Sequence, residues 1–272
     1  MPRFKLTIEY AGTRYSGWQI QKNARTVQGE IDRAVRAVTG RHDFELYGSG
    51  RTDAGVHALA QVAHLDVSTT LAPDPLVRRM NEELPADINI LEATVVPHRF
   101  HARHDAVARQ YVYQIAKRRT AFAKPYVWWV KEPLDVDRLR QAARSFVGMR
   151  DFKSFAAGAT ARTREGDDSP EGGASASTLV MLERLDIVEQ GGLLLIVVEG
   201  SHFLWKMVRR IVGVLVEIGR GGLDADAAAE LIAGSSDLPA RLTAPPSGLF
   251  LSRVYYKGDE RDEMVRAATR LT

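Results

Sequence analysis

The stretch LVMLERLDIVEQGGLLLIVVE, residues 179–199, decides the class of fold. Two apolar runs, 179–190 and 193–199, have the length of strands, and Gly191-Gly192 between them is a strong signal for a β-hairpin. A hairpin joins antiparallel strands, whereas parallel strands need a much longer crossover. This stretch therefore predicts an antiparallel pair in the second half of the chain.

Alternating apolar and polar residues predict further strands on both sides of the hairpin. We expect strands at residues 4–10, 44–47, 61–67, 88–96, 109–116 and 249–256. Helical spacing predicts helices at 27–39, 74–84, 135–146, 204–218 and 224–233, the first capped by Thr26 and ended by Gly40. Hairpins and alternation dominate over continuous apolar strands, which favours an α+β protein with a central, mostly antiparallel mixed sheet flanked by helices.

Length and composition limit the classes of protein that need considering. A chain of 272 residues can form one large domain or two, and we expect two similar α/β halves, 1–105 and 106–272, around a cleft. The chain has no cysteine, which excludes disulfides, thiolate nucleophiles and cysteine-held metals. No apolar run approaches the roughly 18 residues of a membrane span, and the start has no apolar signal core, so we expect a soluble, cytoplasmic protein without membrane contact.

The loop GSGRTDAGVHA, residues 48–58, is the densest cluster of chemically useful residues. It lies between two predicted strands, which can hold Arg51 and Asp53 in fixed positions. Its glycines do not have the spacing of a dinucleotide-binding or Walker loop. A hydrolytic triad of Ser49, Asp53 and His57 lacks the nucleophile-elbow pattern. On spacing alone, a structural turn with an Arg–Asp surface pair remains open.

The same loop resembles the active-site motif G-R-T-D-A-G-V-H-A of the tRNA pseudouridine synthase I (TruA) family. Other segments match that family's patterns in order along the chain, at residues 15–21, 26–28, 81–88, 100–103, 109–113, 203–204, 207–213 and 246–249. The resemblance implies the pseudouridine synthase fold and an isomerase without a cofactor or a metal. Its implied substrate is uridine at positions 38 to 40 in the anticodon arm of tRNA, and its implied assembly is a homodimer.

The resemblance also implies the roles of individual residues. Asp53 falls on the catalytic nucleophile, although a carboxylate can also act as a base at the ribose, and the sequence does not choose between these routes. The resemblance implies four substrate-binding residues. Arg209 pairs with the aspartate, and Tyr111 stacks on the uracil. Arg51 contacts phosphate or replaces the flipped base, and Leu249 excludes water. Without the resemblance, Arg209 is a helix-surface charge and Tyr111 and Leu249 are core residues.

Basic residues before the strand that carries Tyr111 suit an RNA substrate. They are Arg99, His101, Arg103, His104 and Arg109. His98, His101 and His104 are spaced three apart, but the flanking Pro97 does not favour a helix, so we expect no metal site.

Two alternatives remain open from the sequence. The first is the same chemistry at other tRNA or RNA uridines, and the second is an RNA-binding module of this fold without catalysis. The polar, Gly/Ser-rich segment 158–178 departs from the family pattern, and we expect a mobile loop there that alters RNA contacts.

Overall fold

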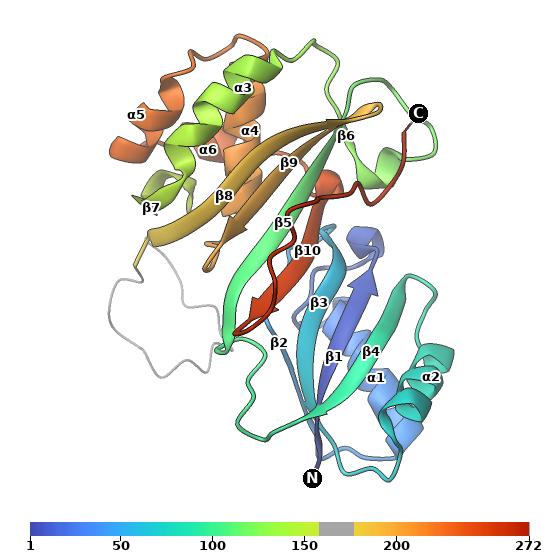
Figure 1. Ribbon diagram of the computed structural model, residues 1–272. Coiled ribbons are helices and arrows are strands. Elements are labelled where there is room, and N and C mark those ends of the chain that lie inside the picture. Colours follow the sequence, from blue (N-terminus) through green and yellow to red (C-terminus); the bar gives the residue numbers. More distant parts are fainter. Residues whose placement is uncertain (158–176, 272) are drawn as a thin grey trace.

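The structure is a computed structural model that describes residues 1–157 and 177–271. The expected loop at 158–178 therefore lies, except for its last two residues, outside the described residues. The described residues form one sheet with helices packed along it (Figure 1).

The sheet has ten strands in the order β4-β1-β3-β10-β5-β9-β8-β7, with β2 paired to β3 and β6 paired to β5. The strands are β1 Arg3–Tyr10, β2 Glu45–Gly48, β3 His57–Asp66, β4 Ile88–Val96, β5 Ala106–Ala116, β6 Trp128–Trp129, β7 Gly148–Asp151, β8 Leu179–Gln190, β9 Leu193–Gly200 and β10 Leu249–Tyr256. The pairs β10–β3 and β5–β6 are parallel, and the other pairs among the described strands are antiparallel. The prediction of a mostly antiparallel mixed sheet is confirmed, including the β8–β9 hairpin at Gly191.

Helices cover the sheet in two groups (Figure 1). Helices α1 Val27–Thr39 and α2 Pro73–Glu83 accompany β1 to β4. Helices α3 Val136–Ala143, α4 Met207–Gly219, α5 Ala227–Ala233 and α6 Leu238–Arg241 accompany the part of the sheet that contains β7 to β9. The caps expected for α1 are present, because the Thr26 hydroxyl accepts a hydrogen bond from the Gly29 N–H and Gly40 is left-handed.

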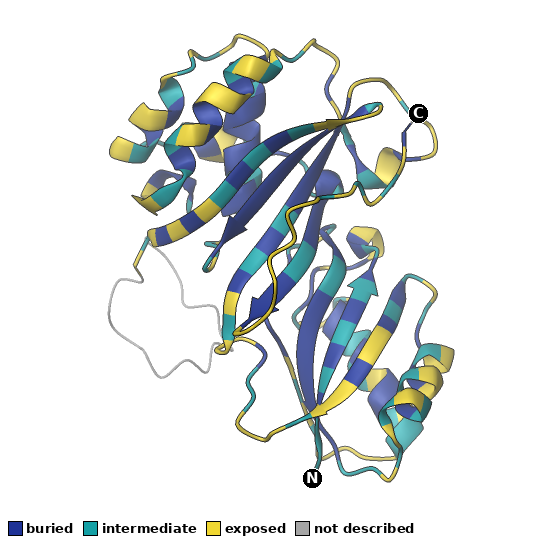
Figure 2. Ribbon diagram, in the orientation of Figure 1, coloured by how far each residue is buried: buried dark blue, intermediate teal, exposed yellow. Residues whose placement is uncertain are grey.

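Two large clusters of buried apolar side chains lie along the sheet, and Figure 2 shows the strands buried at its centre. One cluster draws mainly on residues before 103 and the other mainly on residues after 112. The half-buried ring of Tyr111 packs against both clusters. The last strand, β10, pairs with β3 on one side and β5 on the other, so the sheet is continuous across residue 105. The division into halves 1–105 and 106–272 stays a prediction.

Several element boundaries differ from those that local patterns predict; for example, α3 ends at Ala143 instead of 146, β5 starts at Ala106 instead of 109, and α5 starts at Ala227 instead of 224. Three further differences have a clear cause. Helix α2 starts at Pro73 instead of Asp74, since Pro73 has the fixed φ that suits a first helical position. Helix α4 starts at Met207 instead of Leu204, because Lys206 before it is left-handed. Strand β3 starts at His57 instead of Gln61, because His57 pairs with Phe250 of β10. The loop between β2 and β3 is thereby shortened to residues 49–56.

Candidate active site

Backbone contacts pack the 49–56 loop against its surroundings. The Ser49 N–H donates to the Val62 carbonyl at 2.7 Å, and the Thr52 carbonyl accepts from the Trp18 N–H at 3.1 Å. Gly55 has a φ of +79°, and a Cβ there would lie 2.9 Å from Pro246 Cγ. The loop therefore needs glycine at this turn, and it presents Asp53 in one defined place.

Ser49 and His57 anchor this loop and do not contact Asp53. The Ser49 hydroxyl donates to Gln61 Oε1 at 2.7 Å. The Gly12 N–H donates to His57 Nδ1 at 3.0 Å, so Nε2 carries the proton and donates to the Pro125 carbonyl at 3.1 Å. Burial lowers the pKa of His57, which keeps the ring neutral. A triad of Ser49, Asp53 and His57 is not assembled.

Two side chains, one just before α4 and one in its first turn, approach the Asp53 carboxylate. The Trp205 indole N–H donates to Asp53 Oδ1 at 2.9 Å, and Arg209 Nη1 lies 3.6 Å from Asp53 Oδ2. Arg209 Nε donates to the Ala244 carbonyl at 2.7 Å, which fixes the guanidinium. The Asp53 side chain is 25% exposed and that of Arg209 is 14% exposed, so the pair is sheltered yet open on one side.

Tyr111 lies on β5 near the carboxylate. Its ring meets the Phe203 ring edge-on, with centroids 5.1 Å apart. Burial raises the pKa of Tyr111 to about 12; the Asp53 charge adds to this rise and the nearby Arg109 opposes it. The hydroxyl is therefore protonated at neutral pH, and the ring is an uncharged aromatic surface beside Asp53.

The other two predicted binding residues are placed differently. Arg51 is exposed, and its Nε donates to Gln19 Oε1 at 3.2 Å. Leu249 is buried in the cluster that contains Tyr113, its cross-strand partner on β5. The structure thus brings Asp53, Arg209 and Tyr111 together. It directs Arg51 towards Gln19 and packs Leu249 into the core.

The guanidinium of Arg109, which the sequence placed among basic residues suited to RNA, is hydrogen-bonded to main-chain carbonyls, and its part in binding phosphate stays a prediction. Its guanidinium donates to the carbonyls of Ser49, Arg103 and Ser201, each at 2.9 Å, and more weakly to that of Ala106 at 3.4 Å. It therefore ties the Asp53 loop to the segment before β5 and to the connection after β9. The contacts that hold it are all main-chain carbonyls, which a sequence pattern does not reveal.

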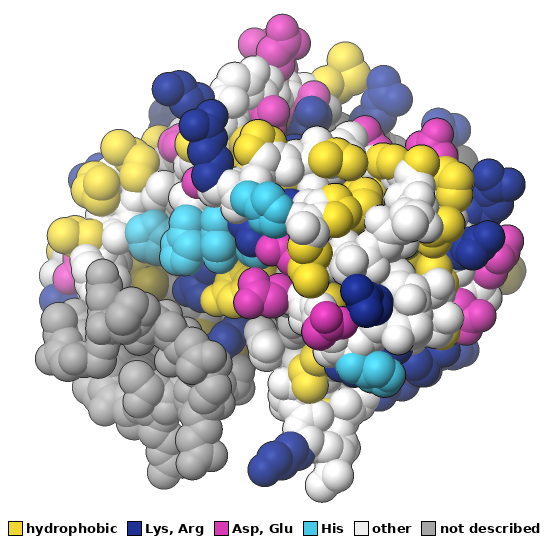
Figure 3. All heavy atoms as spheres, turned by 90° about the horizontal axis from the view of Figure 1, so that it is seen from below, with side chains coloured by type: hydrophobic (Ala, Val, Ile, Leu, Met, Phe, Trp, Pro, Cys, Tyr) yellow, Lys and Arg dark blue, Asp and Glu magenta, His cyan; other side chains and the backbone are white. Residues whose placement is uncertain are grey.

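Histidine side chains gather on the face shown in Figure 3. The ring of His101 contacts His64 and His104, with centroids 4.7 and 4.2 Å apart. His101 Nδ1 accepts hydrogen bonds from the backbone N–H groups of Arg103 and His104. Among the described residues, no group of three or more His, Asp or Glu side chains has the geometry of a metal site.

Sequence reasoning missed Trp205 and Phe203 as neighbours of the site. Phe203 lies in a family-matched segment, but nothing in its pattern indicated that it faces Tyr111. Trp205 stands between the matched segments 203–204 and 207–213, and its partner Asp53 is 152 residues away. A bulky aromatic residue just before a helix was the available signal, and it is a weak one.

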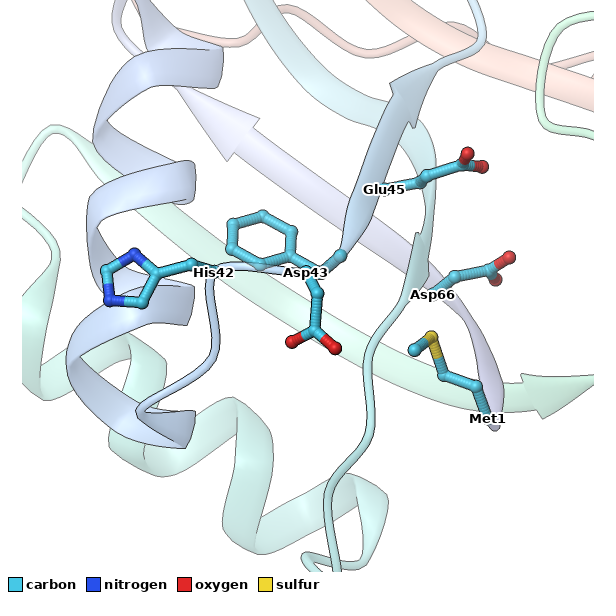
Figure 4. A pocket seen from close by; sticks show the side chains of 6 residues that line it. Met1, His42, Asp43, Glu45 and Asp66 are labelled. Atoms are coloured by element: carbon cyan, nitrogen blue, oxygen red, sulfur yellow. The ribbon is translucent and has the colours of Figure 1, made fainter.

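A surface hollow of about 460 Å³ lies elsewhere, and Figure 4 shows the side chains that line it. It is lined by Met1, His42, Asp43, Phe44, Glu45 and Asp66. Asp66 ends β3, whereas the Asp53 loop precedes the start of this ten-residue strand. At about 3.3 Å per residue the two ends are roughly 30 Å apart. Its three carboxylates repel a polyanion, so the hollow does not extend the Asp53 site.

No helix in the part of the chain that the structure describes is both long and apolar enough to cross a membrane.

Comparisons with known proteins agree along the chain. A family model described as "tRNA pseudouridine synthase" matches residues 6–105 and 142–257. The chain is 41% identical to tRNA pseudouridine synthase A of Nitrobacter winogradskyi, over 95% of this chain and 97% of that protein. It is 42% identical to the protein of that name from Nitrobacter hamburgensis and 41% identical to the one from Rhodopseudomonas palustris BisA53, in each case over 94% of this chain and all of the relative.

Among solved structures, a chain from "Crystal Structure of a Cbf5-Nop10-Gar1 Complex" aligns with 78% of this chain and 54% of its own length, at 11% identity and a TM-score of 0.29. That score is too low to carry an argument.

Proposed function

The chain belongs to the tRNA pseudouridine synthase family, and we propose that it acts at positions 38 to 40 of the anticodon arm with Asp53 as its nucleophile. Membership makes the protein an isomerase that converts uridine in tRNA to pseudouridine. The target positions and the roles of single residues are our proposal. The proposal places the protein in the cytoplasm with its substrate.

The partial exposure of Asp53 beside Arg209 is the observation that supports this proposal most strongly. A carboxylate that is 25% exposed and 3.6 Å from a guanidinium is accessible to a ribose and lies beside a cation. The neutral ring of Tyr111 lies close enough for the Asp53 charge to raise its pKa, and it offers a surface for a uracil.

The reaction exchanges one bond between uracil and ribose for another. In the nucleophilic route, an Asp53 oxygen forms a bond to C1′ while the C1′–N1 bond breaks and its electron pair stays on uracil N1. The uracil turns, C5 bonds to C1′, and the carboxylate leaves with its electron pair. C5 then loses a proton and N1 gains one. The step has no net oxidation or hydrolysis, so the site must hold the detached base and exclude water.

Each binding residue has a proposed part in that task. Arg209 pairs with the carboxylate, and Tyr111 stacks on the flipped uracil, which offsets part of the cost of unstacking it. Arg51, exposed at the rim, contacts phosphate or fills the place of the flipped base. Leu249 excludes water as part of the buried apolar cluster against which Tyr111 packs.

Pseudouridine mapping on tRNA treated with wild type and Asp53→Asn tests the proposal. We expect modification at positions 38 to 40 by wild type, none by Asp53→Asn, and wild-type modification by Asp43→Asn. Asp43 is the matched control because its side chain is 69% exposed and its ion pair with Arg41 is long, at 3.8 Å.

Three results contradict parts of the proposal. Equal modification by wild type and Asp53→Asn contradicts the role of Asp53. Modification confined to uridines outside the anticodon arm contradicts the target. Release of free uracil as the main product indicates a hydrolase.

We also propose that the protein is a homodimer whose two subunits contact one tRNA. Exposed apolar side chains on both edge strands support an association surface: Leu91 and Val95 on β4, and Met149 on β7. Light scattering after size exclusion should give twice the mass of the 30.1 kDa chain. A monomer mass at all concentrations contradicts this part of the proposal.

A further inference from the structure

Trp205 contacts the proposed nucleophile from outside the family-matched segments. It lies between β9 and α4, and its indole N–H donates to Asp53 Oδ1 at 2.9 Å. The residue is 43% exposed, which is unusual for so large a ring unless it serves a surface or a site. Its polar edge points at the carboxylate instead of at solvent.

The two oxygens of Asp53 are not equivalent. Oδ1 accepts the indole hydrogen bond, whereas the nearest atom of Arg209 approaches Oδ2 only to 3.6 Å, beyond hydrogen-bond distance. Among the described residues, no side chain donates a hydrogen bond to Oδ2. The carboxylate is therefore held through one oxygen and open at the other.

The backbone around Trp205 is arranged for this contact. The Trp205 carbonyl accepts a hydrogen bond from the Ala157 N–H at 3.0 Å. Lys206, the next residue, has a φ of +62°, a left-handed conformation that is unfavourable for a non-glycine residue. Its ammonium lies 4.7 Å from the centre of the Trp205 ring. This turn lets Trp205, before the helix, and Arg209, within it, reach the same carboxylate.

We infer that Trp205 is a positioning residue, whose indole N–H holds Asp53 Oδ1 so that Oδ2 faces the ribose. A part-exposed carboxylate can adopt several rotamers, and a hydrogen bond to one oxygen selects the orientation in which the other can react. The inference rests on the proposed role of Asp53. It adds a residue that touches neither ribose nor base and acts through the aspartate.

An NMR experiment tests the contact without reference to activity. The four tryptophans give four indole N–H signals in ¹⁵N-labelled protein, and Trp205→Phe identifies the signal of Trp205. We expect Asp53→Ala to move the Trp205 signal upfield, because the charged acceptor is gone, and to leave the signals of Trp128 and Trp129 in place. An unmoved Trp205 signal overturns the inference, and this variant does not alter Trp205 itself.

Two kinetic measurements test the positioning: single-turnover reactions with protein in excess over tRNA give the rate constant, and multiple-turnover reactions at varied tRNA concentration give KM. Trp205→Phe removes the donor, and we expect a rate constant lower by about 10-fold with KM within about twofold, since one hydrogen bond to a charged group is lost. Trp205→His places Nε2 at the same ring position as the indole nitrogen, so it should recover the rate to within about threefold of wild type. Trp129→Phe removes an indole of similar exposure, 41%, on β6, and should behave as wild type.

The outcomes separate this inference from the proposed function. A wild-type rate constant for Trp205→Phe, or a change in KM alone, overturns the positioning role while pseudouridine still forms. Equal losses in Trp205→Phe and Trp205→His overturn the role of the donor. If wild type itself forms no pseudouridine, the proposed function fails, and the indole signal still reports whether the contact exists.

Discussion

Two aspartate–arginine pairs flank strand β3, and they are built in opposite ways. At its last residue, Arg3 Nε and Nη2 donate to both oxygens of Asp66 at 2.6 and 2.5 Å, and Arg3 Nη1 donates to the carbonyls of His98 and Phe100. Before its start, Arg209 approaches one oxygen of Asp53 at 3.6 Å, and its Nε donates a hydrogen bond to the Ala244 carbonyl instead.

The difference shows how the same type of residue pair, an aspartate with an arginine, can serve two purposes. The bidentate contact with Arg3 satisfies Asp66, joins β1 to β3 and holds the pKa of Asp66 below its ordinary value. The contact of Asp53 is incomplete, so its second oxygen is available to a substrate. We therefore expect the Asp66 pair to govern stability and the Asp53 pair to govern the reaction, as four measurements can check.

Asp53→Asn should have the largest effect. We expect the single-turnover rate constant to fall by at least about 1000-fold, because an amide cannot act as the nucleophile. The free energy of unfolding in urea should change by no more than about 0.5 kcal/mol, since the residue is part-exposed and its ion pair is long. A large loss of stability would make Asp53 a structural residue like Asp66 and break the comparison.

Arg209→Gln should lower the single-turnover rate constant by about 100-fold, because the carboxylate loses its neighbouring cation. Arg3→Gln is the matched control at the other pair, and the folded fraction of that variant should keep the wild-type rate. The same assay on tRNA, normalised to folded protein by circular dichroism, compares the two variants. Similar rate losses in both variants would contradict the division between the pairs.

Asp66→Asn should reverse the pattern seen for Asp53→Asn. We expect a loss of about 2 kcal/mol in the free energy of unfolding, because hydrogen bonds to a charged and largely buried group are removed. The rate per folded molecule should not change. Asp43→Asn, in the same hollow but exposed, should lie within about 0.5 kcal/mol of wild type. An equal effect of both substitutions would show that the bidentate contact adds nothing to the free energy of unfolding.

The smallest effect is a pH dependence of that stability difference. Because the pKa of Asp66 is lower in the folded protein, the contribution of the ion pair is fully present above the unfolded pKa of about 3.9 and is lost as pH falls through the lower folded value. The gap between wild type and Asp66→Asn should therefore shrink as urea unfolding is repeated from about pH 5 towards pH 2. A gap that stays constant would indicate that lost packing, and not the charge, causes the destabilisation.

Local patterns predicted the elements well because their causes are local. Alternation located β1 and β4, the Gly191-Gly192 turn located the β8–β9 hairpin, and Thr26 and Gly40 marked the ends of α1. Each depends on side-chain period or on φ preferences within a few residues. The start of β3 was predicted four residues late, since its pairing with β10 joins residues almost 200 positions apart.

The residues of the candidate site likewise fall into those that the sequence indicated and those that it did not. The sequence pointed to Asp53, Tyr111 and Arg209 through motifs and through the resemblance they carry. It did not indicate that the Arg109 guanidinium donates hydrogen bonds to main-chain carbonyls, because a carbonyl acceptor leaves no signal in the sequence. Nor did it indicate that Trp205 would donate to Asp53.

By itself, the sequence determined the class of fold, since the periodicity of side chains is written along the chain. Its motifs, through their resemblance to a known family, also indicated the family and the loop that carries the proposed nucleophile. Only the tertiary structure decided which carboxylate beside β3 is saturated and which stays open. That outcome depends on contacts between residues 63 and 152 positions apart, Arg3 with Asp66 and Trp205 with Asp53. Such contacts exist only once the sheet has formed and its strand pairing has set which distant side chains meet.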